Sequence, residues 1–255
     1  MNKNKFTLIE LLVVVSIIGI LASLLLPALS SARDKSKLAV CKSNMRQIQV
    51  AYQMYFDDND GYYPTDSPQM SWDDRLNGYD GRNVPLSDLN SAWPLEKSLY
   101  NSEIYACPDD EISRIWGVDT DVLTLSYSPT TYMYYVNAGS INSSKRGITG
   151  FNWKGALDGY ASSKISEINQ ASSTISTFEH MTEGRCLGRD DQSSVSPESF
   201  FLSTANVPHE GFNKSNFLFV DGHVESLNAY STLSIDGGGM GSDTNTTGTM
   251  WDAHR

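Results

Sequence analysis

The sequence predicts an α+β fold in which one long N-terminal helix packs on a small antiparallel β-sheet with extended loops. Three observations support this prediction. Residues 6–29 form an almost unbroken apolar run, and an amphipathic stretch continues from it to residue 58. The segments rich in β-branched and aromatic residues all come later in the chain, so helix and sheet are segregated along the sequence.

The apolar run reads FTLIELLVVVSIIGILASLLLPAL over residues 6–29. Roughly 20 apolar residues at a rise of 1.5 Å cross a hydrocarbon core of about 30 Å, so this run is predicted to be a transmembrane helix. Glu10 lies at its start, where a carboxylate in lipid costs about 3 kcal/mol and marks a functional site by default. A cleaved signal peptide or a simple signal anchor leaves this carboxylate unexplained. Gly19 and Pro27 lie inside the run, and a proline removes one helical hydrogen bond.

Past the apolar run, the helix is predicted to continue as an amphipathic segment over residues 30–60. Six side chains recur at steps of three and four and therefore share one face: Leu38, Cys41, Met45, Ile48, Tyr52 and Tyr55. Gly61 suits a left-handed cap and Pro64 bars continuation, so the helix is predicted to end near Asp58. A helix from residue 6 to residue 58 is about 80 Å long. It would join a membrane anchor to the spine of a globular head.

The net charge of −11 is unevenly distributed along the chain. Residues 1–50 contain seven Lys and Arg against two acidic side chains, a net charge of +5, which leaves −16 for the remainder. An acidic head repels phosphates and has no patch of basic and aromatic residues, so it is predicted not to bind nucleic acid. Basic residues flank both ends of the apolar run, and the positive-inside rule therefore leaves its orientation open.

The first residues of the chain resemble a known family. The basic leader MNKNK, the pentapeptide FTLIE and the apolar helix that follows are similar to the N-terminus of type IV pilins and type II secretion pseudopilins. The resemblance implies that a prepilin peptidase cuts between Lys5 and Phe6 and methylates the new amine. It also implies that Glu10, Gly19 and Pro27 are assembly residues, that Glu10 guides assembly and that the helix unwinds locally near Pro27. Lys5 stands where the family usually has glycine.

This resemblance implies a pilin-like structural subunit of a pilus or secretion pseudopilus, with no catalytic residue, cofactor or metal. The subunit would be stored in the inner membrane with its head in the periplasm. Its expected partners are copies of itself or other pilin-like subunits, the prepilin peptidase, an inner-membrane assembly platform and the lipid bilayer. The expected organisation is a leader at 1–5, a transmembrane helix at 6–29, its amphipathic continuation at 30–60, a head at 61–234 and a tail at 235–255. The tail is low in complexity and expected to be flexible, with Trp251 able to dock it on the head.

The strongest β signal lies in residues 216–227, where two apolar segments flank Asp221 and Gly222. An Asp-Gly pair between such segments predicts a tight hairpin, because glycine readily adopts positive φ. With Cys107-Pro108-Asp109-Asp110 and His209, this hairpin also resembles a prepilin-processing-associated subgroup with the pattern H-X9-DG. Here eleven residues separate His209 from Asp221. We interpret His209, Asp221 and Gly222 as structural residues of the hairpin.

The three cysteines, Cys41, Cys107 and Cys186, are compatible with one disulfide and one free thiol in an oxidising compartment. We predict that Cys107 is oxidised, with Cys41 or Cys186 as its partner. The spacing of the cysteines fits no zinc motif.

Two alternative functions stay open: a membrane-anchored binding protein for glycans or metal, and a metal-dependent hydrolase. Four aromatic side chains are candidates to stack on sugars: Trp72, Trp93, Trp153 and Tyr160. Three histidines fall among acidic residues, and a zinc site would follow if the fold brought them together. These are His180, His209 and His223, with Glu179, Glu210, Asp221 and Glu225. We favour structural roles for His209 and His223, and therefore no metal.

Overall fold

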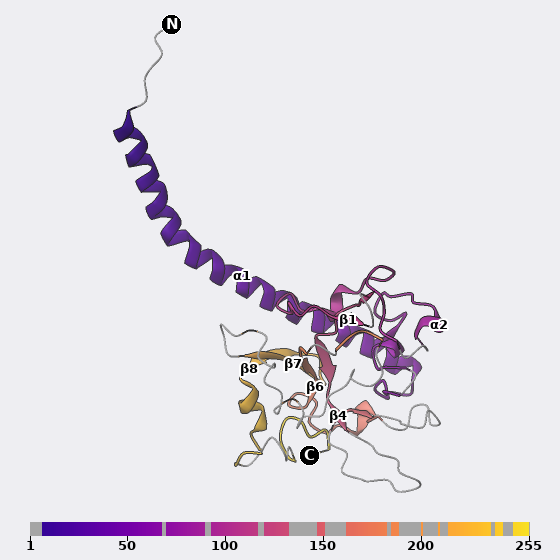
Figure 1. Cartoon of the computed structure of the whole chain (residues 1–255). Coiled ribbons are helices and arrows are strands. Elements are labelled where there is room, and N and C mark those ends of the chain that lie inside the picture. The colour runs from indigo at the N-terminus through magenta and orange to yellow at the C-terminus, as the bar shows by residue number, and fades with distance from the viewer. Residues whose placement is uncertain are drawn as a thin grey trace.

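One helix of 51 residues, α1 (Leu8–Asp58), extends from far outside the head into its core (Figure 1). The computed structural model describes residues 7–67, 70–89, 93–116, 120–132, 147–150, 162–182, 185–188, 200, 209, 214–235, 238–241 and 247–254. Lys5 and Phe6, which flank the predicted cleavage site, lie outside these residues. The helix begins and ends close to the bounds that the sequence predicts.

The N-terminal half of α1 projects from the head and exposes its apolar side chains. Leu8 is 86 % exposed and Leu24 is 71 % exposed in the single chain. By length and composition this helix is able to cross a membrane. It continues without a break through Gly19 and Pro27. Exposed apolar surface of this extent is covered by lipid or by other protein in a working molecule.

The C-terminal half of α1 is the spine of the head. The apolar face that the sequence predicts is buried at Cys41, Met45, Ile48, Tyr52 and Tyr55, whereas Leu38 is half-buried. The helix ends at Asp58, and Asn59 caps it. Asp60 and Gly61 follow with φ values of +52° and +79°, the left-handed conformation in which helices commonly stop, and Asp60 is the first residue to adopt it.

The head contains a four-stranded antiparallel sheet that packs against α1 through β7 and β8. Its order is β3 (Tyr127–Pro129), β6 (Ile175–Glu179), β7 (Ser215–Phe219) and β8 (Val224–Leu227). Two strand pairs are separate from it: antiparallel β1 (Ile115–Trp116) with β2 (Thr120–Asp121), and parallel β4 (Thr131–Tyr132) with β5 (Thr149–Gly150). The short helices are η1 (Asp74–Leu76), α2 (Leu86–Leu89), η2 (Glu103–Tyr105), η3 (Ile165–Glu167) and η5 (Ala229–Leu233). A long helix on a small antiparallel sheet is the predicted α+β arrangement.

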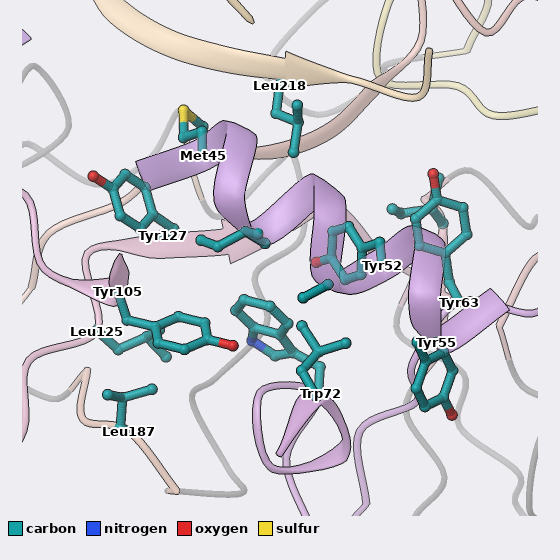
Figure 2. Close-up of a cluster of buried hydrophobic side chains, with 14 of the residues drawn as sticks. Met45, Tyr52, Tyr55, Tyr63, Trp72, Tyr105, Leu125, Tyr127, Leu187 and Leu218 are labelled. Atoms are coloured by element: carbon teal, nitrogen blue, oxygen red, sulfur yellow. The ribbon is translucent and has the colours of Figure 1, made fainter. Parts of the chain in front are cut away.

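The main core lies around the C-terminal half of α1 and is rich in aromatic side chains (Figure 2). The ring of Trp72 is fully buried, with its centroid 6.0 Å from that of Tyr52 and 5.8 Å from that of Tyr105. A ring enclosed in this way has no face left for a sugar. The interpretation of Trp72 as a sugar-stacking residue is therefore wrong, and it fixes the loops to the helix instead.

A second core lies under the sheet and includes the end of the chain. Trp251 is fully buried, and its ring packs edge-on against Phe178 at 4.9 Å and Phe217 at 5.9 Å. Its indole nitrogen donates to the Thr232 hydroxyl at 2.7 Å, and the Ile175 amide donates to the Met250 carbonyl at 2.8 Å. The expectation of a flexible tail is thus wrong for residues 247–254. The buried indole and these two hydrogen bonds hold residues 247–254 against the second core.

The predicted Asp-Gly hairpin joins β7 to β8. Gly222 has a φ of +94°, and its amide donates to the Phe219 carbonyl at 2.9 Å. The Asp221 carboxylate accepts from the His223 amide at 3.1 Å, and the His223 ring stacks on Phe219 at 4.3 Å. A Cβ atom at Gly222 would meet the side chain of Gln49 on α1 at 3.2 Å. The turn therefore needs glycine both for its backbone conformation and for its contact with the helix.

Replacing Gly222 by valine is expected to lower the free energy of unfolding by about 1–3 kcal/mol, because a β-branched residue is strained at positive φ. Gly78 is a matched control, since its φ is +90° but a Cβ there meets nothing within 4 Å. Gly78→Val should lower the free energy of unfolding only through backbone strain at positive φ, so it should be the milder variant. Urea unfolding of both variants measures the difference. Unchanged stability of Gly222→Val would contradict the structural role of this turn.

Candidate functional site

Glu10 is held at the start of α1 by a reciprocal pair of hydrogen bonds with Thr7. Its Oε2 atom accepts from the Thr7 amide at 2.8 Å and from the Thr7 hydroxyl at 2.8 Å. The Glu10 amide in turn donates to the Thr7 hydroxyl at 3.3 Å. This is a capping box, which satisfies two backbone N–H groups that a helix start otherwise leaves without partners.

The capping box means that Glu10 has an intramolecular partner in the single chain. Sequence analysis missed it, although Thr7 three residues before a glutamate at the head of an apolar run is its usual signature. The carboxylate is exposed and lies beside the positive end of the helix dipole, at the end of a long apolar surface. Such a site can hold a cationic group that approaches from another molecule.

A disulfide between Cys41 and Cys107 ties α1 to the loop after η2, with Cα atoms 5.2 Å apart. Cys186 is buried and lies outside this bond. The amide of Asn44, one helical turn beyond Cys41, donates to the carbonyls of Glu103 and Ala106 at 3.2 and 3.0 Å. The bond closes a separation of 66 residues, which in the loop-entropy model contributes up to about 4 kcal/mol.

His209 lies beside this disulfide and pairs with Lys214 just before β7, whereas the turn that it was expected to support follows β7. Its Nδ1 atom is 2.5 Å from Asp109 Oδ2, and its Nε2 atom is 3.2 Å from Glu179 Oε1 at the end of β6. Burial lowers the pKa of His209, but the hydrogen bonds and charges of Glu179 and Asp109 outweigh burial and raise the pKa above its usual value. The interpretation of His209 as a hairpin residue is therefore wrong, whereas Asp221 and Gly222 do form the turn.

Two further groups complete the surroundings of His209. Lys37 on α1 forms an ion pair with Asp109 at 2.8 Å. Asn216 on β7 donates its backbone amide to Glu179 Oε2 at 2.6 Å and its side-chain amide to Oε1 at 2.8 Å. Helix, loop and sheet are thus joined through one set of polar side chains, in which Lys37 and Asp109 are half-buried and the others are buried.

The ligand atoms of four buried residues lie within 4.8 Å of one another, and we call these residues the His209 cluster: Cys41, Cys107, Glu179 and His209. Neither His180 nor His223 contributes to it. Burial lowers the pKa of His180 to about 2, and neither of its ring nitrogens has a hydrogen-bond partner among the described residues. His223 is on the surface, 2.6 Å from Asp221. The three histidines therefore do not converge on the hydrolase site considered above, and Glu210 lies outside the described residues.

The candidate sugar-stacking residues do not form a platform in the described part of the chain. Trp72 is in the core, and Trp93 is 62 % exposed. Trp153 and Tyr160 lie outside the described residues.

A continuous apolar helix start, an amphipathic half in the core and a small antiparallel sheet together define a pilin-like protein. The N-terminal region is 47 % identical over 64 residues to the type II secretion system core protein G of Pseudomonas aeruginosa, covering 25 % of this chain and 45 % of that protein. It is 40 % identical over 61 residues to the type IV major pilin protein PilA of Myxococcus xanthus, and this match covers 24 % of this chain and 28 % of that protein. It is 41 % identical over 61 residues to the type IV wide pilus major component PilA4 of Thermus thermophilus, and this match covers 24 % of this chain and 47 % of that protein.

These matches cover about a quarter of the chain, in its N-terminal region. The chain spans less than half the length of these curated relatives. No protein-family model and no solved structure matches the chain.

Proposed function

We propose that this protein is a structural subunit of a type IV pilus-like or type II secretion pseudopilus filament. The observation that supports this proposal best is the exposed apolar half of α1, which begins with the Thr7–Glu10 capping box and is similar to the same region of filament subunits. A helix of this kind has two environments that cover it. Lipid surrounds it while the subunit is stored, and the helices of neighbouring subunits surround it in a filament.

In this proposal the subunit is anchored in the inner membrane with its head in the periplasm. The prepilin peptidase removes residues 1–5 and methylates Phe6, and an inner-membrane assembly platform then extracts the subunit into a filament. The disulfide and the ion pair between Lys37 and Asp109 keep α1 attached to the head during extraction. Pulling on α1 then moves the whole subunit, as a structural role requires.

The experiment that tests this proposal compares cells with and without the prepilin peptidase. With the peptidase, intact-mass analysis is expected to find a chain that begins at a methylated Phe6, partly in a high-molecular-weight fraction released by shearing. Without it, the full chain should stay in the membrane. Lys5→Gly restores the residue that the family usually has and should be cleaved at least as completely. A membrane-bound chain that keeps Met1 and never enters a sheared fraction would contradict the proposal.

A further inference from the structure

We propose that the His209 cluster is a zinc site when the Cys41–Cys107 disulfide is reduced. Its four ligands would be the two cysteine thiolates, the His209 imidazole and the Glu179 carboxylate. This inference goes beyond a structural role in a filament and does not depend on it. It rests on the geometry and the chemistry of the four side chains.

The four ligands come from segments far apart in the chain and meet inside the head. Cys41 lies on α1, Cys107 follows η2 and Glu179 ends β6. All four residues are buried, with exposed fractions between 0 and 4 %. Zinc binds sulfur at about 2.3 Å and nitrogen or oxygen at about 2.0–2.2 Å, so neighbouring ligands of a tetrahedral zinc are roughly 3.3–3.8 Å apart. Ligand atoms that already lie within 4.8 Å of one another reach that arrangement through side-chain rotations.

The groups behind the ligands are those that a histidine metal site requires. Metal-bound histidine usually donates its second ring N–H to a carboxylate, which fixes the ring and its tautomer. Asp109 occupies this place at 2.5 Å from His209 Nδ1, so the Nε2 atom faces the cluster. Asn216 holds both oxygens of Glu179 by hydrogen bonds. His209 and Glu179 are therefore already held in place in the absence of a metal.

The donor set selects the metal. Two thiolates, one imidazole and one carboxylate suit zinc, whereas calcium and magnesium prefer sites built from oxygen alone. The two thiolates and the carboxylate bring three negative charges, of which Zn²⁺ cancels two. Without a metal, reduction would leave two buried thiols, and no cross-link would then join residues 41 and 107.

The disulfide and the zinc ion exclude each other because they use the same two sulfur atoms. A small dithiol reductant supplies two electrons and two protons, which break the sulfur–sulfur bond and leave two thiols, while the reductant becomes a disulfide. Zinc then displaces both thiol protons and any proton on His209 Nε2. In either state a cross-link joins residues 41 and 107, so the head stays attached to α1 in oxidising and in reducing surroundings.

Zinc binding is tested on the full chain in detergent micelles, oxidised or reduced with a phosphine that is then removed. After addition of ZnCl₂ and desalting, the reduced chain is expected to retain one zinc per chain and the oxidised chain none. The melting temperature of the reduced chain, followed by tryptophan fluorescence, should rise with zinc, because binding to the folded state stabilises it. The proposal would be overturned if the reduced chain retained no zinc and zinc did not raise its melting temperature. This holds also if reduction unfolds the chain.

Three variants separate this site from unspecific binding to thiols. His209→Gln keeps both cysteines and is expected to weaken zinc binding by the reduced chain at least 10-fold. Asp109→Asn keeps all four ligands but removes the carboxylate behind the histidine together with its ion pair to Lys37, and it should weaken zinc binding by about 10–100-fold. His223→Gln removes a surface histidine outside the cluster and should bind as the unaltered chain does. Equal zinc binding by all three variants would show coordination by thiols alone and would overturn the proposed site.

Discussion

Replacing Glu10 by glutamine is expected to abolish filament assembly while the chain stays in the membrane and its head stays folded. A glutamine side chain still accepts hydrogen bonds from Thr7, so the capping box of α1 is retained. The substitution removes only the negative charge. Under the proposed function, that charge pairs with the positive amine of Phe6 on a neighbouring subunit and sets the register of a new subunit. In lipid both charges are costly without a partner, which makes the pairing strong.

Two further variants separate this role from capping. Thr7→Ala removes the hydroxyl of the capping box and should cost about 1 kcal/mol at the helix start, but it keeps the carboxylate and should still assemble. Glu10→Leu loses the carboxylate half of the capping box together with the charge, while its backbone amide can still donate to the Thr7 hydroxyl. It should behave like Glu10→Gln in assembly, with stronger membrane retention. Thr7→Ala thus controls for the helix start, and Glu10→Gln isolates the charge.

The measurement is the amount of sheared filament from cells that lack the unaltered copy. Cleavage before Phe6 and protease resistance of the head are followed in the same cells, because each must be unchanged for the result to concern assembly. Filaments formed normally by Glu10→Gln would show that hydrogen bonding alone suffices. Filaments lost in Thr7→Ala as well would assign the defect to the helix start.

The parts of the fold that were predictable from the sequence are those set by local patterns. The step of three and four from Cys41 to Tyr55 identifies the buried face of α1, because a helix repeats every 3.6 residues. The Asp221–Gly222 pair identifies the hairpin, because its turn needs a positive φ. Both signals lie within a few residues of the structure that they determine.

The parts that were not predictable depend on contacts between distant residues. The choice of Cys41 over Cys186 as the partner of Cys107 follows from how α1 lies on the loop after η2, and no local pattern encodes it. His209 and Glu179 are 30 residues apart in the chain and meet only through the order of the strands. The capping box at Thr7 is different, since its signature was present in the sequence.

A buried pair of carboxyl groups beside η1 was also outside the reach of sequence patterns. The Ser71 hydroxyl lies 2.7 Å from Asp73 Oδ1 and 2.8 Å from Asp74 Oδ2, and all three residues are buried. One hydroxyl proton serves only one of these oxygens, so the second contact needs a proton on the carboxyl side. Asp73 is the charged member, because its Oδ2 atom is 3.3 Å from the guanidinium of Arg82. Asp74 is then a neutral acid that donates to Ser71.

The environment of Asp74 supports this assignment. Burial, together with the charge of Asp73, raises the pKa of Asp74 to about 8, although Ser71 and Arg82 act in the opposite direction. The unfolded chain loses this proton near pH 4, whereas the folded chain keeps it to about pH 8. The folded state therefore binds the additional proton between these values, and the contribution to stability falls as pH rises through that window. The expected slope is up to about 1.4 kcal/mol per pH unit for this group.

Replacing Asp74 by asparagine is therefore expected to stabilise the protein at pH 8 by several kcal/mol relative to the unaltered chain, with a much smaller difference near pH 4. Asparagine has no proton to lose, and its side chain can donate to the Ser71 hydroxyl or accept from the Ser71 amide, although the atom that replaces Oδ2 cannot do both. Asp34→Asn is the matched control, because it makes the same chemical change at an exposed position on α1. Urea unfolding of the full chain in detergent between pH 4 and pH 9, followed by tryptophan fluorescence, gives the three curves. If the curve of Asp74→Asn ran parallel to that of the unaltered chain over this range, Asp74 would be charged in the folded protein, and the proton between Ser71 and Asp74 would have to be placed elsewhere.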